Sequence, residues 1–275
     1  MAISESGQST EPPYHSYKEL RGDGIHASFT PAARRLFWPL DGAFPTAISV
    51  MKTPGSPEDL EPYFQPDVAG DSSGTWHEVS KLSLTEPKVS SIEASVYDLE
   101  QWEFNWMAWH ELHTEGDFVD QEYVTYGDLS DEDRPYAKEQ KEDLSWEEDS
   151  DTDFLVHCCG QDRPLRKRGI TLVVTPAASH EFVTVHDYVC AVHPWLMSLR
   201  EDILKAKTIS RAGPYPASAS KEWMVCQGAW GPDIHVEEKE SWLRKHGDGS
   251  GSGLPRPVPG STAAILARIR DSRKS

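Results

Sequence analysis

The 275-residue chain is poor in cysteine and in long apolar runs. Its four cysteines are Cys158, Cys159, Cys190 and Cys226, and none of them forms a C-x-x-C pair. They are too few for a disulfide framework in a chain of this length, which favours a reducing compartment. No apolar run approaches the roughly 20 residues that a membrane-spanning helix needs. We therefore expect a cytoplasmic or nuclear protein that does not cross a membrane.

Basic residues are also scarce, with 27 Lys and Arg against 45 Asp and Glu and a net charge of −18. The deficit is uneven. Residues 1–127 carry 21 acidic and 7 basic side chains and residues 128–153 carry 12 and 3, whereas residues 154–275 carry 12 and 17. Binding to phosphate groups requires clustered Lys and Arg. The charge pattern therefore argues against contact of the amino-terminal half with nucleic acid or an anionic bilayer, and any such contact would fall to the C-terminal third. We expect a protein partner, with no membrane and no nucleic acid bound.

The order of strand-like and helix-like segments predicts a single α+β domain over residues 17–246. Short strand-like pieces and amphipathic helices follow one another in irregular order, which is typical of an irregular mixed sheet with several helices. Residues 1–16 have few apolar side chains, so we expect a disordered N-terminus. The highly charged residues 128–153 predict an exposed acidic insertion. Residues 247–275 predict a flexible linker that ends in a short basic helix.

A strand followed directly by a helix is predicted between residues 89 and 113. Residues 89–97 alternate with a period of two, as a half-buried strand does. Asp98 and Gln101 then have capping-box spacing. Apolar and aromatic side chains recur every three or four positions beyond them and share one helix face: Leu99, Trp102, Trp106, Trp109 and His113. Tryptophans at this spacing indicate a packed helix face rather than a ligand platform.

Two further predictions concern the second half of the chain. The run Ile170 to Val174 predicts a buried strand within residues 169–175. Thr184 and Asp187 predict a capping box at the start of a helix. Pro194 predicts the end of this helix and the start of a second one that extends to Lys207.

Two segments resemble parts of uncharacterised hypothetical proteins of filamentous fungi. They are Y-D-L-E-Q-W-E-F-N-W-M-A-W-H at 97–110 and T-V-H-D-Y-V-C-A-V-H-P-W-L-M-S-L-R-E-D-I-L at 184–204. The resemblance extends over residues 90–245 and implies a fungal source and one compact domain. That group has no assigned activity, so the resemblance implies no functional residues.

Five histidines and cysteines have the residue types of a zinc site. They are His186, Cys190 and His193 on the predicted helix, and His157 and Cys159 on the predicted strand 154–159. The three helical residues fall within about 60° of one another around the helix axis. However, His193 precedes a proline, where helical geometry is disfavoured, and boundary residues of any helix have this spacing. The sequence therefore favours no cofactor and no bound metal.

A second histidine pair, His110 and His113, invites comparison with the H-E-x-x-H helix of zinc proteases. The spacing is one residue short, so Glu111 does not hold the general-base position. We interpret both histidines as interfacial residues at the end of the tryptophan-rich helix.

No local pattern places a nucleophile, a base and an oxyanion donor together, so we expect a non-catalytic interaction or scaffold protein. Two alternatives stay open. A metal-dependent hydrolase would use the five histidines and cysteines above, and an acidic nuclear regulator would use residues 128–153 with the basic run Arg163 to Arg168. The short C-terminal helix needs a surface on which to fold and supplies the partner-binding candidates Ile265, Arg268, Ile269 and Arg270.

Overall fold

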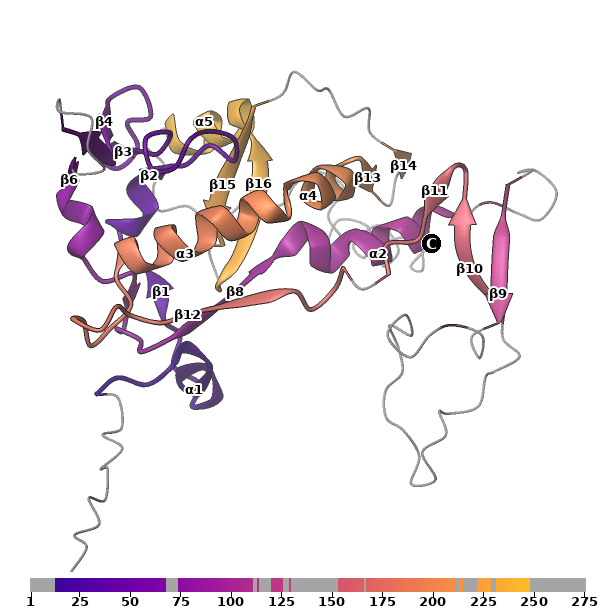
Figure 1. Cartoon of the computed structure of the whole chain (residues 1–275), viewed down its shortest axis with the longest axis horizontal. Helices are drawn as coiled ribbons and strands as arrows, with labels where there is room; N and C mark the ends of the chain where they lie inside the picture. The colour runs from indigo at the N-terminus through magenta and orange to yellow at the C-terminus, as the bar shows by residue number, and fades with distance from the viewer. Residues whose placement is uncertain are drawn as a thin grey trace, which may run out of the picture.

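The computed structural model describes residues 13–67, 74–110, 113, 120–125, 129, 153–165, 167–210, 213–214, 222–228 and 231–247. These ranges contain five α-helices and several small sheets, which confirms the predicted α+β class (Figure 1). Within them, no helix combines the length and apolar character that a membrane crossing requires.

Several sequence predictions fall on other parts of the chain. Residues 1–12 and all of the acidic segment 128–153 except Leu129 and Asp153 lie outside the described residues. The same holds for the predicted C-terminal helix with its partner-binding candidates Ile265, Arg268, Ile269 and Arg270.

A four-stranded mixed sheet forms the centre of the molecule. Its order is β12 (Thr171–Val174), β8 (Ile92–Val96), β16 (Asp233–Glu238) and β15 (Trp223–Gln227). The central pair β8 and β16 is parallel, and both outer pairs are antiparallel. β8 buries every second side chain, as its alternating sequence predicts.

Small antiparallel sheets and helices surround this centre. The strand pairs are β1 (Ser28–Phe29) with β7 (Thr85–Glu86), β3 (Ser49–Met51) with β2 (Leu36–Phe37) and β4 (Leu60–Pro62), β5 (Phe64–Pro66) with β6 (Gly74–Trp76), and β13 (Ile209–Ser210) with β14 (Gly213–Pro214). The helices here are α1 (Tyr17–Gly22), α5 (Lys239–Gly247) and the 3-10 turns Ala33–Arg35 and Glu78–Lys81.

β12 is an edge strand and not the buried strand that its composition predicts. It pairs with β8 on one side and packs against α3 (Val185–Ser198) on one face. Val174 is buried, whereas the side chain of Val173 is 57% exposed. A strand covered on one face can bury only alternate side chains, so an apolar run alone does not indicate full burial.

The capping box of Thr184 and Asp187 is confirmed, but the predicted break at Pro194 is wrong. The Thr184 hydroxyl accepts from the Asp187 backbone N–H, and the Asp187 carboxylate accepts from the Thr184 N–H. α3 then continues through Pro194, and α4 (Arg200–Lys207) starts only after Leu199. His193 and Leu196 are buried beside the proline, so packing holds the helix although one backbone donor is lost.

α2 (Tyr97–His110) leaves the end of β8 without an intervening loop. Its buried stripe confirms a packed face, with Trp106 only 1% exposed and Trp102 and Trp109 half-buried. Asp98 does not serve as a capping-box residue: its carboxylate accepts from the Val236 N–H at 3.2 Å. This contact ties the first turn of the helix to β16.

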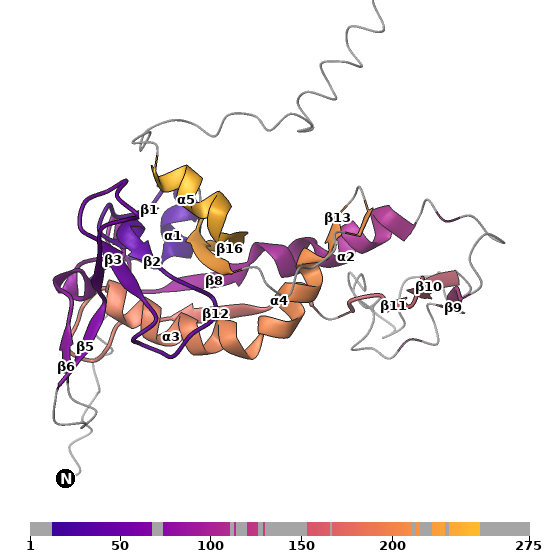
Figure 2. The ribbon, with the colours of Figure 1, turned by 90° about the horizontal axis from the view of Figure 1, so that it is seen from above.

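α2 connects the central sheet with a second, smaller sheet, which we call the distal sheet. It consists of β9 (Glu122–Thr125), β10 (Asp153–Cys158) and β11 (Gln161–Asp162), with β10 in the middle. Figure 2 shows α2 extending from the central sheet towards it. Trp106, Cys158 and Ile209 are buried together here, and we call these three residues the distal core.

Candidate metal centre

Four ligand-type side chains meet where the end of α2 approaches the distal sheet. They are His110, His113, Cys158 and Cys159, and we call them the His/Cys cluster. One ligand atom from each lies within 4.8 Å of all the others. In the described part of the chain, no other group of three or more His, Cys, Asp and Glu side chains has this arrangement.

The two histidines are placed by the end of α2. His110 is the last helical residue and extends the buried stripe that contains Glu103 and Trp106. The His113 N–H donates to the His110 carbonyl at 3.0 Å. The two imidazole rings lie 5.0 Å apart between centroids and are nearly perpendicular at 82°.

The two cysteines are adjacent in sequence, and a turn allows both thiols to reach the same point. Successive side chains of a strand point to opposite faces. Cys159 leaves the strand geometry with a φ of 54°, and Gly160 follows with a φ of 73°. Left-handed backbone is costly for a residue with a Cβ and is concentrated at functional sites.

Asp120 holds this turn. Its carboxylate accepts from the Cys159 N–H at 3.1 Å and from the Gly160 N–H at 2.6 Å. It also lies 3.7 Å from Nε2 of His157, whose Nδ1 is 2.6 Å from Asp162. The hydrogen bond to Asp162 raises the pKa of His157. Asp120 is therefore a positioning residue for the two thiols, because it fixes the backbone that carries them.

The spacing of the heteroatoms matches the edges of a zinc tetrahedron. Bonds of about 2.3 Å to sulfur and 2.0–2.1 Å to nitrogen give edges of about 3.8 Å for S–S, 3.3 Å for N–N and 3.6 Å for N–S. The two thiol sulfurs are 3.7 Å apart, and the two imidazole Nδ1 atoms are 3.3 Å apart. Nδ1 of His113 lies 3.3 Å from each sulfur.

Comparison with known protein families, curated proteins and solved structures finds no match to this chain. The assignment of the site therefore depends on its geometry, and the resemblance to proteins of filamentous fungi stays a prediction.

Hydrogen bonds alone account poorly for these contacts. Nδ1 of an imidazole carries either one proton or one lone pair and forms one good hydrogen bond. Nδ1 of His113 nevertheless has three heteroatoms at 3.3 Å, namely one nitrogen and two sulfurs. A cation at the centre of the cluster would be a common partner for all four groups.

The electrostatics of the cluster suit a metal that displaces protons. Burial, helped by the nearby His113, lowers the pKa of His110 to about 4, so this ring is neutral and able to coordinate at pH 7. Burial and the neighbouring Cys158 raise the pKa of Cys159 to about 11. Without a cation that thiol stays protonated, and zinc binding would release its proton.

A buried ion pair supports the same junction. Nε of Arg163 donates to the Glu103 carboxylate at 2.7 Å, and the two side chains are 3% and 4% exposed. The pair joins α2 to the chain that follows β11. Within the described part of the basic run, Arg163 is buried and Lys167 pairs with Asp202 at 2.6 Å, whereas the side chain of Arg168 is 63% exposed.

The structure does not bring together the five histidines and cysteines that the sequence offers as candidate ligands. His186 and Cys190 touch on α3, with 3.5 Å between Nε2 and Sγ. Nδ1 of His193 accepts instead from the Trp38 indole at 2.9 Å. His157 pairs with Asp162 on the distal sheet, as described above. Cys159 is the one predicted ligand that belongs to the His/Cys cluster.

Regular helix and strand spacing in the sequence does not indicate the His/Cys cluster. An H-x-x-H pair at the end of a helix and a C-C-G triplet at the end of a strand both lie where the chain turns. The glycine at 160 is the sequence feature that indicates such a turn.

Proposed function

We propose that this chain is a non-catalytic zinc-binding protein with an interaction role. One Zn²⁺, held by the His/Cys cluster, would fasten the distal sheet to the end of α2. The observation that carries the proposal is the agreement between the N–N, N–S and S–S distances within the cluster and the edges of a zinc tetrahedron.

The ligand set supports a structural rather than a catalytic zinc. Catalytic zinc keeps one position open for water or substrate, whereas structural zinc has four protein ligands. The cluster offers two imidazoles and two thiols, which is a closed set. A hydrolase, the alternative considered from the sequence, would need one of these four to be absent. The nuclear alternative stays a prediction, because Arg166 and most of residues 128–153 lie outside the described part of the chain.

The small distal core supplies a reason for a metal at this place. Among the described residues it comprises three buried side chains, Trp106, Cys158 and Ile209, with Met107, Leu155 and the two half-buried tryptophans against it. So little apolar surface gives little stability, and small units of this kind commonly depend on a metal or disulfides. A zinc ion would let the distal sheet present a fixed surface, including the exposed Tyr123 on its edge strand β9, to a protein partner.

Metal analysis of protein purified without chelators tests this proposal. We expect one zinc per chain, and we expect Cys159→Ser and His113→Ala each to lose most of it. Cys190→Ser is the matched control, because Cys190 also contacts a histidine but lies outside the cluster. Cobalt substitution adds a second readout, since thiolate ligands give an intense charge-transfer band that Cys159→Ser weakens. A metal-free wild type that does not take up added zinc would refute the proposal.

A further inference from the structure

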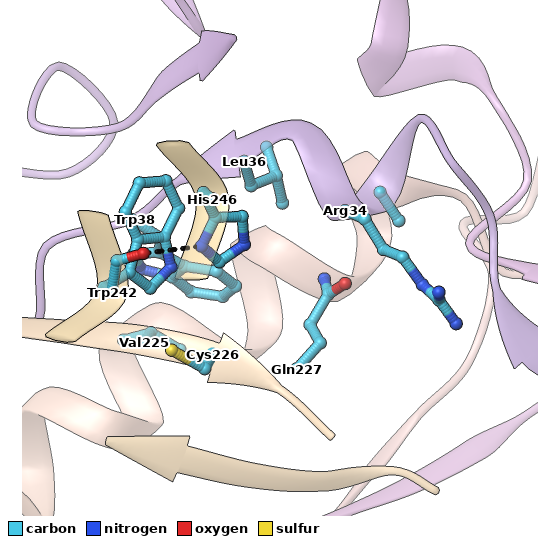
Figure 3. A pocket seen from close by; sticks show the side chains of 9 residues that line it. Arg34, Leu36, Trp38, Val225, Cys226, Gln227, Trp242 and His246 are labelled. Carbon is cyan, nitrogen blue, oxygen red and sulfur yellow. Dashed lines mark hydrogen bonds between the residues drawn. The ribbon is translucent and has the colours of Figure 1, made fainter. Parts of the chain in front are cut away.

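A cavity of about 160 Å³ lies between the N-terminal region, β15 and α5, far along the chain from the His/Cys cluster (Figure 3). Its walls include Leu36, Trp38, Trp242 and His246, with Gln227 from the end of β15 and Arg34 at its edge. Apolar and aromatic walls with a few convergent polar groups are the usual composition of a small-molecule site.

The side-chain amide of Gln227 is the unusual group in this cavity. Its oxygen and its nitrogen are both buried, and neither has a hydrogen-bond partner among the described residues. Figure 3 shows the amide extending towards the space between His246 and Arg34. A buried amide without partners is costly to the fold, so a group of this kind calls for an explanation.

His246 adds an acceptor beside this amide. Its Nδ1 lies 2.8 Å from the Trp242 carbonyl and must donate to it, which leaves Nε2 as the acceptor of the neutral ring. The imidazole is stacked on the Trp242 indole, with 3.9 Å between centroids and 17° between planes. Trp38 already donates its indole N–H to His193, so it presents only its ring to the cavity.

Arg34 supplies the positive charge. It is exposed, and among the described residues its guanidinium takes part in no ion pair or hydrogen bond, whereas its backbone N–H donates to the Thr30 carbonyl. A carboxylate or phosphate is the natural partner of a free guanidinium.

We propose that this cavity binds a one-ring planar heterocycle that carries adjacent N–H and C=O groups and a negatively charged substituent. The Gln227 amide would form two parallel hydrogen bonds with the N–H and C=O edge, as amides do with complementary ring edges. The aromatic walls would hold the ring plane. The volume fits one ring, because a cavity of about 150 Å³ accommodates benzene. This proposal is independent of the zinc site.

Three probes, each titrated into the full-length protein, separate the contribution of the N–H and C=O edge from that of the negative charge. Orotate has the ring, this edge and a carboxylate. Uracil lacks the carboxylate, and benzoate lacks the N–H and C=O edge. We expect isothermal titration to give orotate the lowest Kd, with uracil and benzoate each weaker by about tenfold or more, as expected for the loss of one charged or one paired hydrogen-bond interaction.

Variants assign these differences to residues. Gln227→Leu should lower the affinity for orotate by at least about tenfold. The free variant should melt at the same or a higher temperature than wild type, because it no longer buries an unpaired amide. Gln227→Glu keeps the shape but removes the N–H donor, and it covers the case in which the leucine variant fails to fold. Arg34→Gln should reduce the affinity for orotate to that for uracil, and the affinity for uracil should not change. Gln65→Leu, at an exposed position on β5, is the control.

Two outcomes would overturn the proposal. The first is that wild type binds none of the three probes at millimolar concentration. The second is that Gln227→Leu and Gln227→Glu both bind orotate as wild type does.

Discussion

Two regions of the molecule are held together by different means. Around the central sheet, buried side chains from β8, β16 and α3 belong to one continuous apolar core. At the distal sheet, the three buried apolar residues that the described ranges contain are supplemented by the ion pair of Glu103 and Arg163 and by the His/Cys cluster. The central region therefore distributes its stability over many contacts, whereas the distal region depends on a few specific ones.

The largest expected effect comes from Trp106→Ala in the distal core. The indole is 1% exposed and lies 4.2 Å from the His110 ring between centroids. Its removal should lower the free energy of unfolding by about 3 to 5 kcal/mol. Urea unfolding followed by circular dichroism measures this. Unfolding identical to that of wild type would show that the distal core contributes nothing.

Breaking the buried ion pair should cost nearly as much. Arg163→Met leaves the Glu103 carboxylate buried without its cation, which should cost about 3 kcal/mol. The double variant Glu103→Leu with Arg163→Met should recover most of that loss, since no charge is then left unpaired. A double-mutant cycle in urea measures the coupling. Costs that simply add would contradict a direct interaction between the two side chains.

Removal of zinc should affect the distal sheet alone. A chelator should accelerate amide hydrogen exchange in β10 and leave β8 and β16 unchanged, because the cluster contacts only the first of these strands. Mass-spectrometric exchange with and without chelator compares the strands in one sample. Equal acceleration in both sheets would mean that the two regions unfold as one unit.

The smallest expected effect is a pH dependence that arises in the central region. Burial lowers the pKa of His193, whose Nδ1 accepts from Trp38. The unfolded chain then binds this proton more tightly than the folded one. The contribution of His193 to stability is thus complete above its ordinary pKa of about 6.5 and declines as the pH falls through that value towards the lowered one.

The variant His193→Gln isolates this contribution, because glutamine can still accept from the Trp38 indole. Urea midpoints at pH 7.5 and pH 5.5 should differ more in wild type than in the variant. An equal difference in the two proteins would assign the pH dependence to other groups, such as the buried His110.

Local features of the fold were accessible from sequence, and features set by distant contacts were not. The alternation in β8 and the Thr184 capping box depend on neighbours in the chain, and both predictions are confirmed. The helix through Pro194 and the half-exposed β12 depend on what packs against them. Such tertiary effects are not encoded in a short window of sequence.

The candidate site illustrates the same limit. Cys159 is a candidate ligand from the sequence, but its partners depend on a left-handed turn that Asp120 holds from 39 positions away along the chain. Neither the turn nor its carboxylate support follows from helical or strand spacing. Helix ends and strand ends are the places where such spacing ceases to apply.

Because β8 continues directly into α2, the strand and the helix form one rigid element. The 14 residues of α2 span about 21 Å, so a rotation of about 5° at the central sheet moves the far end by about 2 Å. No loop at the start of α2 can absorb such a rotation, and Asp98 ties the first turn of the helix to the backbone of β16. A displacement of the distal sheet would therefore be transmitted through α2 to the parallel pairing of β8 and β16.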